Sequence, residues 1–155
     1  MVSVFHPMFV HFPIALLILA GIASIIDFSS QKYDLKTVIL WNLIAGTLGS
    51  LIAVLSGFRD SEVIPHNEVI HAIMEIHEKL GVTIAVLSFV LSGWFFMRKS
   101  LMKRIENLYF VLAMSCVIII ILINSFLGGK MVYDNGAGIK PMEKYFQVDS
   151  HEHNS

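Results

Sequence analysis

Charge is scarce in this 155-residue chain, and so is cysteine. Only 15% of the residues are charged, against about 25% in a typical soluble domain, whereas 55% are hydrophobic. These proportions exclude a soluble globular domain and an intrinsically disordered chain. The single cysteine excludes a disulfide scaffold, and the net charge of −1 excludes a basic nucleic-acid binder. The length allows one domain.

The chain does contain four long runs without Asp, Glu, Lys or Arg. A helix crosses the hydrocarbon layer of about 30 Å with about 20 apolar residues, so each run can span it alone or with a short extension. We therefore predict an all-α transmembrane four-helix bundle in a lipid bilayer, with spans at about 7–27, 36–58, 66–98 and 106–128. These spans form one domain, residues 1–139, and residues 140–155 are expected to be a flexible tail.

The basic residues indicate how the bundle is oriented. The two short connections, 27–36 and 98–106, carry six of the eleven Lys and Arg residues, while the other five are spread over a much longer length. Short loops rich in Lys and Arg stay in the cytoplasm. We expect a multi-pass protein of the bacterial inner membrane with both termini on the outer side. All seven histidines then fall on the outer side of the chain.

Two of these histidines are expected to lie at similar depth in the bundle. His11 is about 6 Å inside the start of the first span, and His77 lies one turn before the uncharged part of the third. The first and third spans enter from the same side, so the two imidazoles can face each other across the bundle. This arrangement favours haem b with His11 and His77 as axial ligands. Gly81, one turn below His77, would give the porphyrin room.

Other residues near the same end could complete such a site. His6 lies at the start of the first span, and Tyr133 and Lys130 follow the fourth span, where they could line the haem edge or pair with a propionate. An interfacial histidine can also simply hydrogen-bond a neighbouring hydroxyl, carbonyl or headgroup. The second span carries Gly46, Gly49, Ala53 and Gly57 at helical spacing, which favours close helix packing.

A second interpretation of the outer residues is a divalent transition-metal site. Mixed imidazole and carboxylate ligands suit zinc, manganese or iron. The candidate ligands lie around the start of the third span: His66, His71, Glu75 and Glu78. Glu68, from the same segment, and His6, from the start of the first span, could join them. A polar stripe of this kind is also typical of a water-facing helix surface.

Three segments resemble a known family. The opening residues 6–17 read HPMFVHFPIALL, residues 77–81 read HEKLG, and residues 128–139 read GGKMVYDNGAGI. These segments are similar to the signatures of a bacterial four-span membrane family known as domain of unknown function 2231. The positions that match are His6, His11, His77, Gly128, Gly129 and Tyr133. His66 and His71 have no clear counterpart in the pattern.

The resemblance implies a four-helical fold, and some relatives are joined to cytochrome c-type segments, which implies redox work at the outer face. We therefore expect a membrane b-type cytochrome that exchanges single electrons with a quinol, a cytochrome c or another redox partner, as an enzyme or as a relay. Two other functions are compatible with the sequence. One is a metal-binding or transport protein, and the other is a structural subunit of a membrane complex. The chain could also form a homo-oligomer.

Overall fold

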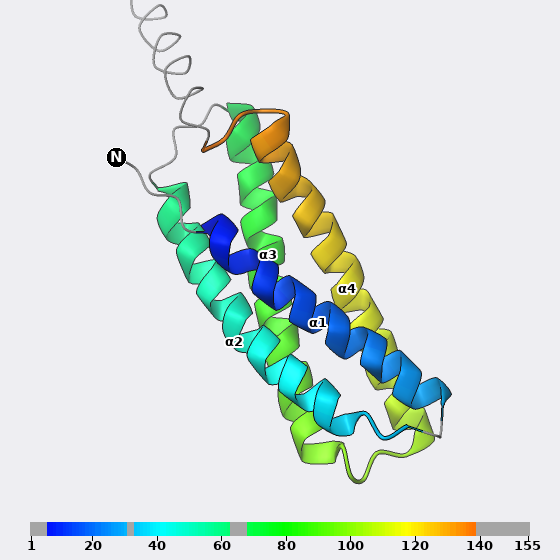
Figure 1. Ribbon diagram of the computed structural model, residues 1–155. Coiled ribbons are helices and arrows are strands. Elements are labelled where there is room, and N and C mark those ends of the chain that lie inside the picture. Colours follow the sequence, from blue (N-terminus) through cyan, green and yellow to red (C-terminus); the bar gives the residue numbers. More distant parts are fainter. Residues whose placement is uncertain (1–5, 31–32, 63–67, 139–155) are drawn as a thin grey trace, which may run out of the picture.

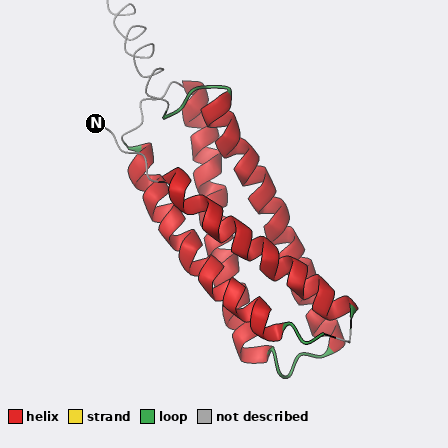
Figure 2. Cartoon of the chain, in the orientation of Figure 1, coloured by secondary structure: helices red, strands yellow, loops and turns green. Residues whose placement is uncertain are grey.

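The computed structural model describes residues 6–30, 33–62 and 68–138. Over these residues the chain is helical apart from its connections, and the four helices run antiparallel to their neighbours in sequence (Figures 1 and 2). The helices are α1 (His6–Ser29), α2 (Lys36–Ser61), α3 (Glu68–Arg98) and α4 (Arg104–Tyr133). The predicted all-α class with four long apolar helices is confirmed. The predicted tail, residues 140–155, lies outside the described residues.

The bundle consists of two helical hairpins, α1–α2 and α3–α4, packed side by side. Within and between the hairpins, α1 packs on α2, α2 on α3, α3 on α4, and α4 on α1, so the four helices close a ring. Helices α1 and α3 therefore face each other diagonally and run in the same direction (Figure 1). The start of α1, the end of α2, the start of α3 and the end of α4 meet at one end of the bundle, which we call the histidine end. The opposite end, with connections 30–35 and 99–103, is the basic end.

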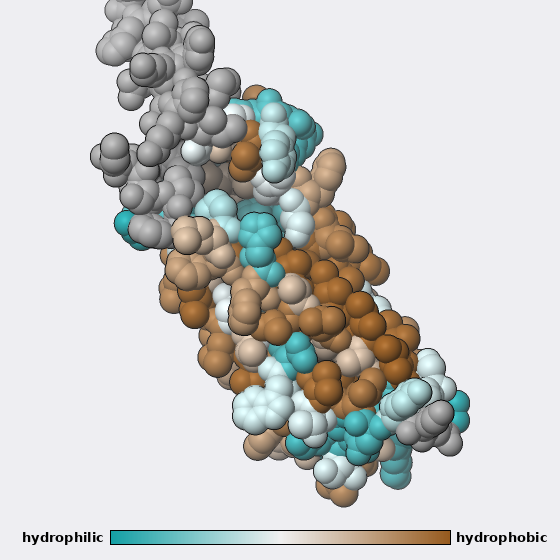
Figure 3. All heavy atoms as spheres, in the orientation of Figure 1, coloured by the Kyte–Doolittle hydropathy of each residue, from teal (hydrophilic) through white to brown (hydrophobic). Residues whose placement is uncertain are grey.

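The outer surface of the bundle is apolar over most of its length (Figure 3). Large side chains such as Leu55, Phe89 and Phe126 are each about two-thirds exposed on separate helices. Each helix is long and apolar enough to cross a membrane. A surface of this kind requires lipid around it, because contiguous apolar patches of this extent are absent from soluble monomers.

Glycines on α2 allow α1 to approach closely. A Cβ at Gly46 would lie 2.8 Å from two side-chain carbons of Leu17, and a Cβ at Gly49 would lie 3.2 Å from the ring of Pro13. Leu17 is 1% exposed and belongs to the central core, so it has little room to move. The glycines predicted to mediate helix packing therefore do so at these two positions, where close approach increases dispersion contacts.

We predict that Gly46→Ala destabilises the bundle, because the new methyl group would overlap Leu17. Overpacking of this kind costs about 1–3 kcal/mol. Gly93→Ala is the matched control, since a Cβ at Gly93 meets nothing within 4 Å. The free energy of unfolding in detergent micelles, followed by circular dichroism, should fall for Gly46→Ala and stay level for Gly93→Ala. Equal stability of the two variants would contradict this packing.

Candidate functional site

His77 is fixed to the neighbouring helix of its own hairpin. Its ring is half-buried, and Nδ1 lies 3.0 Å from the backbone carbonyl oxygen of Asn124 on α4. The ring also lies against Gly128, where a Cβ would be 3.1 Å from Cε1 of the imidazole. A carbonyl oxygen only accepts hydrogen bonds, so Nδ1 must carry the proton and donate it. When the ring is neutral, this bond fixes the tautomer in which Nε2 is unprotonated.

His6 is held in the same way by α2. Its Nδ1 lies 2.8 Å from the backbone carbonyl oxygen of Ala53, and a Cβ at Gly57 would be 3.2 Å from that same nitrogen. The backbone N–H of His6 also donates to Oδ2 of the buried Asp60 at 2.7 Å. A carboxylate at the first residue of a helix satisfies an N–H that has no partner within the helix, and it also complements the helix dipole. Asp60 thus fixes where α1 begins.

The glycine in each hairpin explains why a ring can reach the backbone of an intact helix. The carbonyl of residue i in a helix already accepts the N–H of residue i+4, and its second lone pair is usually shielded by side chains. Gly57 follows Ala53 by four residues, and Gly128 follows Asn124 by four. Because glycine has no Cβ, it uncovers the carbonyl one turn before it and leaves room for an imidazole.

The two supports are related by a constant sequence offset. Each member of the second set lies 71 positions after its counterpart in the first: His77 after His6, Asn124 after Ala53, and Gly128 after Gly57. The ring of helices described above has the same symmetry, since α1 corresponds to α3 and α2 to α4. The two hairpins therefore support their histidines in the same way and present them to each other from diagonal helices.

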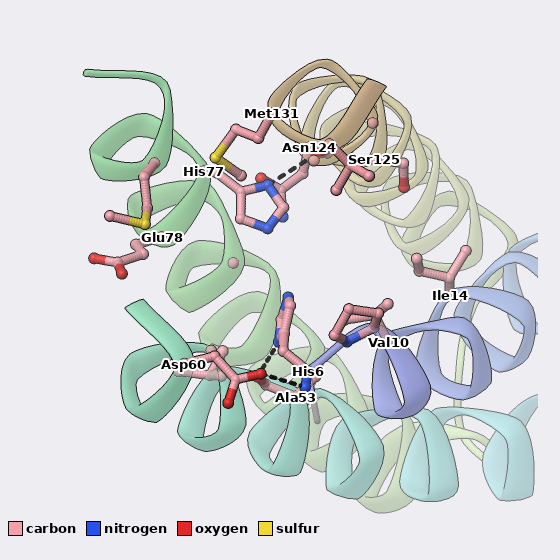
Figure 4. A pocket seen from close by; sticks show the side chains of 18 of the residues that line it. His6, Val10, Ile14, Ala53, Asp60, His77, Glu78, Asn124, Ser125 and Met131 are labelled. Carbon is pink, nitrogen blue, oxygen red and sulfur yellow. Dashed lines mark hydrogen bonds between the residues drawn. The ribbon is translucent and has the colours of Figure 1, made fainter. Parts of the chain in front are cut away.

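The rings of His6 and His77 meet at the centre of the histidine end, and we call them the imidazole pair. Their centroids are 5.9 Å apart and their planes are nearly perpendicular, at 87°. Figure 4 shows the ring of each histidine extending toward the other, with the nitrogen that does not face its carbonyl at the tip. In neutral rings that donate from Nδ1, both Nε2 atoms are acceptors. Two lone pairs that face each other repel unless a cation, a metal ion or a hydrogen-bond donor lies between them.

The imidazole pair lines a cavity of about 600 Å³ that reaches into the bundle. Along α4 its wall extends from Ile121 to Tyr133, a length of about 18 Å. The wall is mainly apolar, with Val10, Ile14 and Ile121 among its residues. A buried Oδ1 of Asn124 in this wall has no hydrogen-bond partner among the described residues, as is typical where a ligand or water belongs. The volume is in the range of small-molecule and cofactor sites.

Comparison with protein families identifies a match for this chain. The family described as "Predicted membrane protein (DUF2231)" matches residues 3–141, which is nearly the whole chain. The chain belongs to this family. Comparisons with curated proteins and with solved structures give no match. The family resemblance stated from the sequence is thereby confirmed, and the imidazole pair, its two glycines and the cavity all lie within the matched region.

The sequence favours His11 as the partner of His77, but the ring that contacts His77 in this family member is His6. His11 lines the cavity, is exposed, and bonds through Nδ1 to the carbonyl oxygen of Pro7 at 2.7 Å. Gly81 and Tyr133 also line the cavity. Lys130 is exposed and is not among the lining residues; its backbone carbonyl instead accepts hydrogen bonds from the turn that follows α4.

The alternative metal residues are not brought together where the structure describes them. Glu75 forms an exposed ion pair with Lys79 at 2.6 Å, and Glu78 lines the cavity with its carboxylate turned away from the imidazole pair (Figure 4). Among the described residues, no three His, Cys, Asp or Glu side chains converge on a point that could hold an ion. His71 is exposed on α3, and His66 lies outside the described residues, so the complete set stays a prediction.

Sequence reasoning missed the supports of the imidazole pair: the carbonyls of Ala53 and Asn124, the glycines beneath the rings, and Asp60. One signal was available. Gly57 follows His6 by 51 residues, and Gly128 follows His77 by the same number. A histidine and a glycine at equal spacing in two successive helix pairs indicate a repeated hairpin. The rest depends on which carbonyl the ring reaches, and only the packed helices show this.

We predict that Gly128→Ala and His77→Ala are coupled in a double-mutant cycle. Gly128→Ala alone should lower the free energy of unfolding by about 1 kcal/mol or more, because the methyl group crowds the imidazole. In a His77→Ala background the ring is gone, so the same change should cost little. Contacting residues typically show coupling energies of about 0.5–3 kcal/mol. Additive effects in denaturation experiments would show that the ring does not lie on this glycine.

Proposed function

We propose that this protein is a membrane b-type cytochrome in which His6 and His77 are the axial ligands of one haem b. The haem would lie between the two hairpins at the histidine end, and the protein would carry single electrons. The proposal of haem binding and electron transfer is based on the imidazole pair. That the protein is a membrane protein follows from its family.

The observation that carries the proposal is the tautomer and spacing of the imidazole pair. Histidine ligands of metals generally donate their other ring N–H to a carbonyl or carboxylate, and both rings here do so. Two imidazoles that bind one ion from opposite sides, through bonds of about 2 Å, have ring centroids about 6 Å apart. The centroids of His6 and His77 are 5.9 Å apart. The chemistry and the spacing of the pair therefore support axial ligation of one haem.

The lack of a third metal-binding side chain near the imidazole pair, among the described residues, favours haem over a free metal ion. A free transition-metal ion in a protein takes four or more ligands, and the described residues offer no third His, Cys, Asp or Glu at this point. A porphyrin supplies four nitrogens of its own and requires an apolar cavity. The cavity beside the imidazole pair is of suitable size and mainly apolar.

The protein's own residues then define what the centre can do. His6 and His77 would hold the haem iron from both sides, which would leave no position open for oxygen and would suit electron transfer. The basic connections favour an orientation with the histidine end on the outer side of a bacterial inner membrane. A centre at that depth would exchange electrons with a quinol, or with a cytochrome c or another redox subunit, near the outer face. It would not by itself carry an electron across the whole bilayer.

The test is the visible spectrum of protein purified from haem-replete cells, with His11→Ala as the matched control. The wild type and His11→Ala should show the Soret and sharp α bands of a low-spin, bis-histidine haem. His6→Ala and His77→Ala should each lose the low-spin bands. Pyridine extraction should give haem b at one per chain.

Three results would overturn the proposal. A colourless protein that also fails to bind added haemin would exclude haem at this site. A colourless protein that binds zinc through the same two histidines would favour the metal-binding function. Loss of the bands in His11→Ala with retention in His6→Ala would restore the pairing expected from the sequence and refute the one given by the structure.

A further inference from the structure

A second cavity lies at the basic end, remote from the imidazole pair. It has a volume of about 350 Å³, and all four helices or their immediate ends contribute to its wall. Three of its residues are cationic and one is acidic: Lys36, Lys99, Arg104 and Asp27. The cavity therefore carries an excess of positive charge at the level where a helix leaves the hydrocarbon layer.

The carboxylates at this end already have partners. Asp27 accepts the backbone N–H of Leu35 at 2.9 Å, and Asp34 accepts that of Lys36 at 3.2 Å. Glu106 accepts two hydrogen bonds from the guanidinium of Arg98, at 2.8 and 3.0 Å, and one from the indole of Trp94. These acids hold the helix ends and the α3–α4 corner together.

The three cations of the cavity outnumber its one carboxylate, that of Asp27. In the part of the chain that the structure describes, none of Lys36, Lys99 and Arg104 forms an ion pair with a carboxylate. The guanidinium of Arg104 lies 5.7 Å from the ring centroid of Phe28, which also lines the cavity and orients the arginine. Three like charges around one cavity repel each other, so the arrangement favours an anion between them.

We propose that this basic cavity binds an anionic phosphate group, from either an acidic phospholipid headgroup or free phosphate. Arginine and lysine are the side chains that recognise phosphate, and basic pockets between membrane helices bind anionic headgroups. The cavity lies at the end of the apolar surface, where the phosphate layer of a bilayer meets the helices. The occupant would neutralise the cations and hold all four helix ends together. This site is independent of the haem proposal.

The experiment measures thermal stability and bound lipid for the full chain in a neutral detergent. One arm adds phosphatidylglycerol, a second adds phosphatidylcholine, and a third adds inorganic phosphate at constant ionic strength. Native mass spectrometry counts the lipids that remain bound. We expect phosphatidylglycerol or phosphate to raise the melting temperature in a saturable way, and phosphatidylcholine to do so far less. A phosphatidylglycerol response without a phosphate response assigns the site to lipid, and a response to both assigns it to the phosphate group alone.

Variants locate the effect. Lys99→Gln and Arg104→Gln should each weaken the apparent affinity about fivefold, since each basic group contributes about 1 kcal/mol to an anionic headgroup contact. Lys103→Gln removes the same charge from an exposed residue at the same end that does not line the cavity, and it should have little effect. Lys99→Arg keeps the charge and should bind as the wild type does. No response to either anion, or an equal loss in Lys103→Gln, would overturn the proposal.

Discussion

The organisation of the histidine end depends on one interaction, the hydrogen bond from an imidazole to a helix carbonyl uncovered by glycine. In a membrane-embedded bundle there is little water to satisfy a polar ring, so an imidazole must find a protein partner. Ala53 and Asn124 provide that partner through their backbones, and Gly57 and Gly128 make it accessible. This bond fixes the tautomer, aims Nε2 into the cavity and sets the distance between the rings.

The same interaction occurs twice, once in each hairpin. The repeat is not exact: Asp60 holds the start of α1, while α3 begins nine residues before His77 and extends the histidine end. The result is a pair of similarly supported imidazoles in an environment that differs on its two sides. Glycines such as Gly57, Gly81 and Gly128 line the cavity between the hairpins, and they place no side chain in it.

Most of the fold could be predicted from the sequence, because uncharged runs of about 20 residues have few alternatives to membrane helices. The inward position of His77 and Gly81 on α3 could be predicted too. Helical periodicity places them on one face with Ile70 and Ile84, which are both buried. The partner of His77 was not. Depth counted from Pro7 favours His11, but the contact is decided by which ring reaches a carbonyl on α2, and periodicity contains no information about that.

Each histidine is anchored entirely within its own hairpin: His6 on α2, and His77 on α4. The hydrogen bond that holds each ring comes from its own hairpin, and the edge-on ring contact joins the two hairpins. The chain thus contains two finished half-sites, each complete once two consecutive helices have paired in the bilayer. The two supports therefore lie on opposite sides of the cavity, one in each hairpin.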